Sequence, residues 1–186
     1  MSTLYIFDFD DTLVDSDAQV RITHEDGTVT ALSSEQYAKY SEKETDSLDF
    51  TDFDSYPKNA EIIEPVFSQL KDSIASAGSG NVVILTARSN PEPVRLFLKN
   101  NGVPNIAVVA VGSSDPRSKA LYILDRVKNS GHNEVVVFED NVRNIRTIRA
   151  TLTDKGVKLT TNRVSNGAVV STLKEKILRS AVRSIL

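Results

Sequence analysis

Three aspartates stand close together near the start of the chain, directly after a run of apolar residues. They are Asp8, Asp10 and Asp11 in the segment IFDFDDTLV, which spans residues 6–14. Asp8 and Asp10 are two residues apart, so both carboxylates can face one cleft if the strand loosens into a turn there. Carboxylates grouped at a buried edge repel one another and need a compensating cation. Mg²⁺ suits such a group because it is a hard divalent cation that prefers oxygen ligands.

The segments that must position these aspartates predict a parallel α/β sheet. Four short apolar runs are rich in β-branched residues and do not alternate, which is typical of strands buried on both faces: LYIF (4–7), VVIL (82–85), IAVVAV (106–111) and EVVVF (134–138). Apolar residues at helical spacing lie between them at 65–77, 93–100 and 118–128. A fifth strand is expected near 157–161 and a closing helix from about Ala168. Open α/β sheets bind ligands at the carboxyl ends of their strands, where Asp8 and Asp10 are expected.

The stretch from 14 to 60 does not fit this alternation of strands and helices. Within it, QVRIT and TVTAL flank HEDG (24–27), which predicts a β-hairpin because glycine supplies the positive φ of a tight turn. Ser33 or Ser34 can cap a short helix that runs to Tyr40, and an acidic loop follows. We expect one domain over the whole chain, with 14–60 as a small insertion after the first strand.

Composition excludes several kinds of site and protein. The chain has 186 residues and no cysteine, which excludes disulfides, thiolate metal sites and cysteine nucleophiles. No apolar run approaches the roughly 20 residues that span a membrane, and the N-terminus lacks the basic start of a signal peptide, so we expect a cytoplasmic protein without membrane contact. The net charge of −3 gives no overall basic field for nucleic acid.

The chain resembles the haloacid dehalogenase superfamily, because four motifs of its phosphatases occur in the required order. The first, Asp-x-Asp-x-Thr after an apolar strand, is matched by DFDDT (8–12). The second, an apolar strand ending in threonine, is matched by VVILTAR with Thr86, and the third, a lysine, by Lys119 in SKALYIL. The fourth, an acidic pair after another apolar strand, is matched by VVVFEDN with Glu139 and Asp140. The hairpin, LSSEQYAKY and LDFTDFDSY further resemble small phage-encoded hydrolases of this superfamily, which would place the protein in a host cytoplasm.

This resemblance implies a Rossmann-like, three-layer α/β fold with a central parallel sheet of about five strands, and a Mg²⁺-dependent phosphohydrolase. Asp8 would attack phosphorus and form an aspartyl-phosphate, which splits one difficult displacement into two. Asp10 would protonate the leaving oxygen and later take a proton from water. The metal ligands implied are Asp8, Asp10 (through its backbone carbonyl), Asp140 and Glu139.

The resemblance also implies a phosphate-binding set, and it leaves two assignments open. The residues expected to bind the phosphoryl group are Thr86, Ala87, Arg88 and Lys119. Arg117 lies close to Lys119 and could be the third-motif cation instead. Glu139 stands where the family commonly has Gly or Asp, and Asn144 where one version of the motif has a second acid. Whether either residue contributes to the metal site stays open.

Three functions from different classes remain in view. The leading one is a phosphomonoesterase acting on a nucleotide, a nucleic-acid end or a small phosphoester. The second is a nucleic-acid end-processing factor resembling a 3′-phosphatase, with phosphate contacts from Arg88, Arg143, Arg146, Arg149 and the basic C-terminal segment. The third is a catalytically silent phosphate- or metal-binding module of the receiver type. That module needs its phosphorylated aspartate at the end of a middle strand, and VVILTAR and IAVVAVG carry none.

Overall fold

The four predicted apolar runs form neighbouring parallel strands in a computed structural model that describes residues 2–57 and 59–171. These strands are β1 (Thr3–Phe7), β7 (Val82–Thr86), β8 (Ala107–Ala110) and β9 (Glu134–Glu139). They belong to a six-stranded sheet with the order β11-β10-β9-β1-β7-β8. The prediction of a mixed α/β protein with a mostly parallel central sheet is therefore confirmed.

One edge of the sheet differs from the prediction. The fifth parallel strand, β10 (Lys158–Ser165), is longer than the expected 157–161, and β11 (Ala168–Ser171) returns antiparallel to it. The prediction of a helix starting near Ala168 was wrong at this point. Asn166 and Gly167 both have positive φ (51° and 70°), which is the geometry of a two-residue hairpin turn. The remainder of the predicted helix lies outside the described residues.

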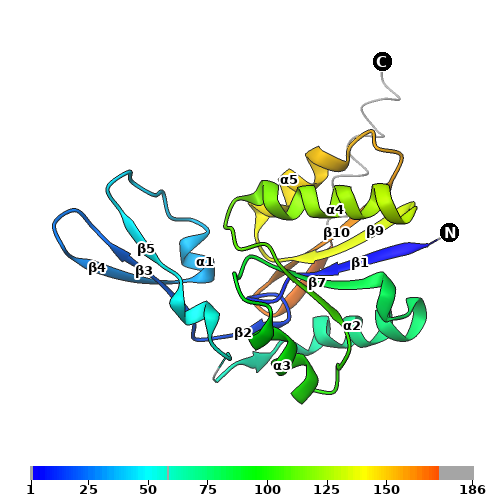
Figure 1. Cartoon of the computed structure of the whole chain (residues 1–186), viewed down its shortest axis with the longest axis horizontal. Helices are drawn as coiled ribbons and strands as arrows, with labels where there is room; N and C mark the ends of the chain where they lie inside the picture. Colours follow the sequence, from blue (N-terminus) through cyan, green and yellow to red (C-terminus); the bar gives the residue numbers. More distant parts are fainter. Residues whose placement is uncertain (1, 58, 172–186) are drawn as a thin grey trace.

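Helices cover both faces of the sheet (Figure 1). Alternate residues of each strand point to opposite sides, so each face has apolar side chains that a helix can bury. Phe7 of β1 packs in the core cluster that includes residues of α2 (Glu64–Ala77) and α3 (Glu92–Asn100). Leu4 and Ile6 of the same strand pack in the cluster that includes residues of α4 (Pro116–Ser130) and α5 (Val142–Leu152). The helices predicted at 65–77, 93–100 and 118–128 are thus confirmed with slightly different bounds, and α5 was not predicted.

Residues 16–57, which we call the insertion lobe, form a second and smaller sheet beside the central one. The predicted hairpin is confirmed as β3 (Gln19–Thr23) and β4 (Val29–Ser33), and β5 (Ser47–Asp49) pairs with β3 on its other edge. The predicted short helix is α1 (Ser34–Tyr37), and the acidic segment after it also contains the 3₁₀ helix η1 (Thr51–Asp54). The lobe has a small core of its own, made of Ala18, Val20, Ile22 and Phe53.

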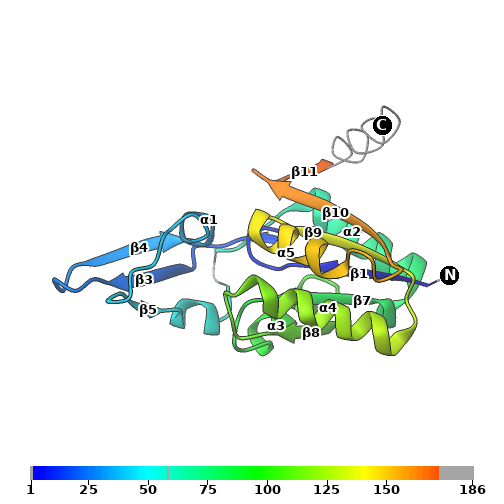
Figure 2. The same cartoon turned by 90° about the horizontal axis from the view of Figure 1, so that it is seen from above.

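The insertion lobe lies where the central strands end. The short strands β2 (Val14–Asp15) and β6 (Glu61–Ile62) pair antiparallel at its base. Figures 1 and 2 show the lobe beside the carboxyl end of β1, on the side of the sheet away from the N-terminus. Any site at the carboxyl ends of the strands therefore has the lobe as a neighbour.

Candidate active site

Four charged side chains meet at the carboxyl ends of β1 and β9. Phe7 of β1 pairs with Phe138 of β9, so the residues that come next, Asp8 and Glu139, lie side by side. Lys119, in the first turn of α4, reaches both of them. Its Nζ lies 2.8 Å from Oδ1 of Asp8 and 2.9 Å from Oε2 of Glu139. Asp140 completes this group of Asp8, Lys119, Glu139 and Asp140, which we call the Asp8 cluster.

Burial dominates the electrostatics of the Asp8 cluster. Asp8, Lys119 and Glu139 are 7%, 3% and 2% exposed. Burial and repulsion from Glu139 raise the pKa of Asp8 to about 8, although Lys119 opposes this shift. Burial also raises the pKa of Asp140 to about 7 and raises that of Glu139. Burial alone would lower the pKa of Lys119, but the carboxylates of Asp8 and Glu139 outweigh it and raise that pKa. With all three carboxylates ionised, one lysine leaves the cluster short of positive charge.

The three carboxylates of the cluster could hold a metal ion. Asp8, Glu139 and Asp140 each offer an oxygen, and these oxygens lie within 4.8 Å of one another. Asn144 Nδ2 donates to Oε1 of Glu139 at 3.0 Å, and the Thr12 hydroxyl donates to Oδ1 of Asp140 at 3.4 Å. Glu139 is therefore part of the group, whereas Asn144 contacts it through Glu139. Three carboxylates that share one lysine form an oxygen donor set that fits a hard divalent cation.

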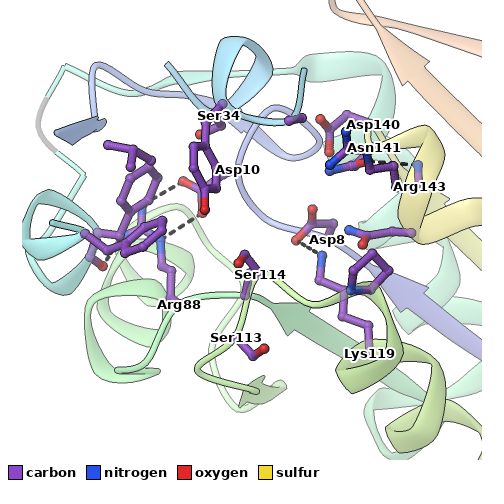
Figure 3. A pocket seen from close by; sticks show the side chains of 18 of the residues that line it. Asp8, Asp10, Ser34, Arg88, Ser113, Ser114, Lys119, Asp140, Asn141 and Arg143 are labelled. Carbon is purple, nitrogen blue, oxygen red and sulfur yellow. Dashed lines mark hydrogen bonds and ion pairs between the residues drawn. The ribbon is translucent and has the colours of Figure 1, made fainter. Parts of the chain in front are cut away.

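Asp10 points away from Asp8 and pairs with Arg88 instead, as Figure 3 shows. Its two carboxylate oxygens accept hydrogen bonds from Nη2 and Nε of Arg88 at 2.7 and 2.9 Å. This two-pronged geometry is the strongest form of an arginine–carboxylate pair. The Asp10 carboxylate is thus not among the three that could hold a metal, and its backbone carbonyl stays a predicted ligand.

Arg88 also ties the end of β7 to the insertion lobe. Its Nη1 donates to the backbone oxygens of Phe53 and Ser55 at 2.7 and 3.2 Å. Its guanidinium carbon lies 5.3 Å from the ring centroid of Phe9 and 5.4 Å from that of Phe53. With one N–H from Nε, one from Nη2 and two from Nη1 engaged, four of the five donors of Arg88 are in use. In this conformation Arg88 has one donor left for its predicted role in substrate binding.

The other two residues predicted around Arg88 differ in exposure. Thr86 ends β7 and is 1% exposed, and its hydroxyl oxygen accepts the backbone N–H of Arg88 at 3.2 Å. Ala87 lines the neighbouring cavity, whereas Thr86 does not. In this arrangement Thr86 shapes the turn that presents Ala87 and Arg88.

The structure separates the two candidates for the third-motif cation. Lys119 enters the Asp8 cluster with its side chain buried. Arg117 lies on the surface, where its Nη2 pairs with Oδ2 of Asp115 at 2.6 Å and 78% of its side chain is exposed. Of these two residues, Lys119 is the one that contacts Asp8.

A cavity of about 510 Å³ extends from the Asp8 cluster to Asp10 and is lined by the core and the insertion lobe together. Several lining residues were not predicted from the sequence: Ser34, Tyr37, Phe50 and Phe53 of the lobe, Ser113 and Ser114 after β8, and Asn141 before α5. Arg143 at the start of α5, named from the sequence only as a phosphate contact of the end-processing alternative, also lines the cavity. Ser113 and Ser114 follow a predicted strand, so the rule that placed Asp8 could have found them. The lobe residues gave no such signal, because their place depends on how the lobe packs.

No helix in the described part of the chain is both long and apolar enough to cross a membrane. The chain matches no protein-family model, no curated protein and no solved structure.

Proposed function

We propose that the protein is a Mg²⁺-dependent phosphomonoesterase of the haloacid dehalogenase type, with Asp8 as the nucleophile. The single observation that carries this proposal is the Asp8 cluster. A buried carboxylate follows the central strand β1, contacts a buried lysine, and shares with Glu139 and Asp140 a group that could hold a metal ion. The sheet with helices on both faces supports the Rossmann-like architecture of that superfamily.

The reaction would proceed in two displacements at phosphorus. Oδ1 of Asp8 accepts hydrogen bonds from Lys119 and from the backbone N–H of Phe9, which leaves Oδ2 to attack. The new bond joins Oδ2 to phosphorus, the ester P–O bond breaks, and the alcohol leaves with a proton. Water then attacks phosphorus, the bond to Asp8 breaks, and inorganic phosphate leaves. A bound Mg²⁺ supplies positive charge for the transferring phosphoryl group.

Asp10 is the proposed acid and base, and this role requires it to move. Both of its oxygens accept hydrogen bonds from Arg88 in the described arrangement. One oxygen must turn toward the leaving group before it can deliver a proton. Arg88 then keeps contact with the other oxygen and with the backbone of the insertion lobe.

The arginines that suggested the end-processing alternative give it little support. Arg88 is engaged by Asp10, and Arg149 donates to Thr161 at 2.6 Å. Of the four arginines, Arg88 and Arg143 line the cavity. A track of cations for a polynucleotide backbone is thus not formed by these four residues around the cavity.

Hydrolysis of p-nitrophenyl phosphate with Mg²⁺ or with EDTA tests the proposal. We expect turnover with Mg²⁺, none with EDTA, and a loss of at least about 10³-fold in Asp8→Asn, because that variant lacks the nucleophile. Asp125→Asn, an aspartate of α4 outside the cavity lining, is the matched control and keeps full activity. Undiminished turnover in Asp8→Asn would rule the mechanism out.

A further inference from the structure

The two walls of the cavity differ in chemistry. The wall from the core carries most of the charged and hydroxyl groups, among them the Asp8 cluster, Ser113 and Ser114. The wall from the insertion lobe contributes a group of apolar and aromatic residues: Val20, Tyr37, Ala38, Phe50 and Phe53. A ligand that places its phosphate against the first wall therefore has its other end against the second.

Two aromatic rings of the lobe wall pack against each other. Tyr37 and Phe50 meet edge to face, with ring centroids 5.4 Å apart. The Tyr37 hydroxyl donates to Glu42 at 2.6 Å, and burial followed by this bond raises the pKa of Tyr37 to about 12, so the ring stays neutral. Phe50 is 38% exposed, which makes it one of the few large apolar side chains open to solvent in the described residues. An open aromatic side chain beside a candidate active site is suited to contact a ring of a ligand.

The charges around the cavity argue against a ligand with several phosphates. Six lining carboxylates face three cations, and the carboxylates are Asp8, Asp10, Glu42, Asp54, Glu139 and Asp140. Two of the cations, Arg88 and Lys119, already pair with Asp10 and Asp8. The lobe wall has Glu42 and Asp54 and no lysine or arginine among its lining residues. A second or third phosphate at that wall would meet repulsion and no partner.

We infer that the site takes a phosphomonoester with a single phosphate, whose alcohol part carries an uncharged aromatic ring that lies against Tyr37 and Phe50. The phosphate end of this inference rests on the proposed function, and the ring end rests on the lobe wall. The cavity of about 510 Å³ lies within the range of roughly 300–1,000 Å³ that holds small molecules. A nucleoside monophosphate and a simple aryl phosphate share this chemistry.

Comparing substrates with and without a ring tests the inference, using kcat/KM for phenyl phosphate, uridine 5′-monophosphate, uridine 5′-diphosphate, glycerol 3-phosphate and acetyl phosphate. We expect the two ring-bearing monophosphates to exceed glycerol 3-phosphate by about tenfold or more, since stacking on an aromatic side chain contributes about that factor. Which of the two is better then separates a nucleoside from a simple aryl alcohol. The diphosphate should be poor. Equal use of ring-bearing and ring-free monoesters would overturn the inference.

The variant Phe50→Ala separates binding of the aromatic ring from phosphoryl transfer. It should raise KM about tenfold for the ring-bearing monophosphates, change kcat little, and leave acetyl phosphate unaffected. Leu121→Ala is the matched control, because Leu121 is 59% exposed on α4 and does not line the cavity. An equal loss on acetyl phosphate and phenyl phosphate in Phe50→Ala would contradict a ring site.

Binding measurements keep the inference testable if no ester is hydrolysed. Calorimetry with phenylphosphonate and methylphosphonate compares a ring with a methyl group on the same phosphonate, in the presence of Mg²⁺. Tighter binding of phenylphosphonate that is lost in Phe50→Ala supports the ring site even where the proposed reaction fails. Equal affinity for the two phosphonates overturns it.

Discussion

The two ends of the cavity hold their carboxylates in different ways. The Asp8 cluster stands on regular elements: Asp8 directly follows β1, Glu139 ends the adjacent strand β9, and Lys119 comes from the first turn of α4. At the other end, Asp10 and Arg88 stand on the loops after β1 and β7, and Arg88 is held by backbone oxygens of the insertion lobe. The first end is held by the central sheet, whereas the second is held partly through the insertion lobe.

This difference suggests a division of labour in the proposed reaction. A nucleophile and a metal site need a fixed geometry, because a displacement of about 1 Å can cost about 100-fold in rate. An acid that must first donate and then accept a proton needs freedom to turn. The contacts of Arg88 make that freedom depend on the lobe, which also supplies the aromatic wall of the cavity. Substrate contact with the lobe and the position of Asp10 are therefore coupled through Arg88.

Removing the lysine of the Asp8 cluster should have the largest effect on stability. Lys119→Met leaves Asp8 and Glu139 buried without their common partner, and breaking a buried pair in this way costs about 3–5 kcal/mol. Urea unfolding at pH 8 measures the free energy, and added Mg²⁺ should restore part of it. Lys158→Met is the control, because Lys158 pairs with Glu134 at the surface. Similar losses of unfolding free energy in both variants would show that the buried lysine contributes no more than a surface lysine.

Changing Arg88, at the Asp10 end of the cavity, should alter activity more than stability. Arg88→Lys keeps the positive charge but loses the planar fork that grips both oxygens of Asp10 and the backbone of the lobe. We expect kcat to fall about 100-fold, with a smaller change in KM, because Asp10 is no longer positioned. Limited proteolysis should also cut the insertion lobe faster. A variant with wild-type kcat would show that Asp10 does not depend on Arg88.

The free energy of unfolding of the metal-free protein should fall as the pH rises, because carboxylates of the Asp8 cluster have raised pKa values. The folded protein raises the pKa of Asp8 to about 8 and of Asp140 to about 7, from 3.8. Between about pH 4 and pH 8 the folded state therefore binds more protons than the unfolded chain, so stability decreases through this range. Asp46 of the lobe behaves in the opposite way. Hydrogen bonds, of which the one from the backbone of Lys43 has the largest effect, lower the pKa of Asp46 to about 2, so Asp46 stabilises the folded protein above pH 4 and loses that effect only below it.

Thermal unfolding in EDTA measures this effect. We expect the midpoint to be several degrees lower at pH 8.5 than at pH 5.5, and Mg²⁺ to remove most of the difference because it favours the ionised carboxylates. Asp8→Asn should flatten the dependence without metal, since it removes one of the raised groups. A midpoint that rises over the same range in EDTA would contradict the burial of these carboxylates.

The sequence was most informative where local pattern and structure agree. Continuous β-branched runs predicted the central strands, and the carboxyl-end rule predicted where Asp8 lies. Glu139 was expected from the family resemblance, and it ends the strand β9 beside β1. The Asn166–Gly167 turn is a local hairpin signal too, but the apolar residues after it also fit the spacing of a helix, which the sequence predicted there. These elements depend on neighbouring residues, so a single sequence carries enough information to predict them.

The insertion lobe was predicted less completely, because its contacts join residues far apart in the chain. Arg88 meets the backbone of Phe53 across 35 positions and the carboxylate of Asp10 across 78. No spacing in the sequence marks such pairs, and a backbone oxygen is an acceptor that every residue offers. The aromatic wall of Tyr37 and Phe50 was not predicted for the same reason. These residues line the cavity only because the lobe packs beside core residues that are distant in the sequence.

The smallest expected effect belongs to Arg117, the cation closest in sequence to Lys119 among the described residues of α4. Arg117→Ala removes an exposed pair with Asp115, and such pairs contribute little because water screens both charges. We expect wild-type turnover and an unchanged unfolding midpoint, measured beside Lys119→Met. The two residues are two positions apart on the first turn of one helix, yet only the side chain of Lys119 reaches Asp8. A clear loss of activity in Arg117→Ala would mean that the loop before α4 rearranges when substrate binds and brings the exposed cation into the cavity.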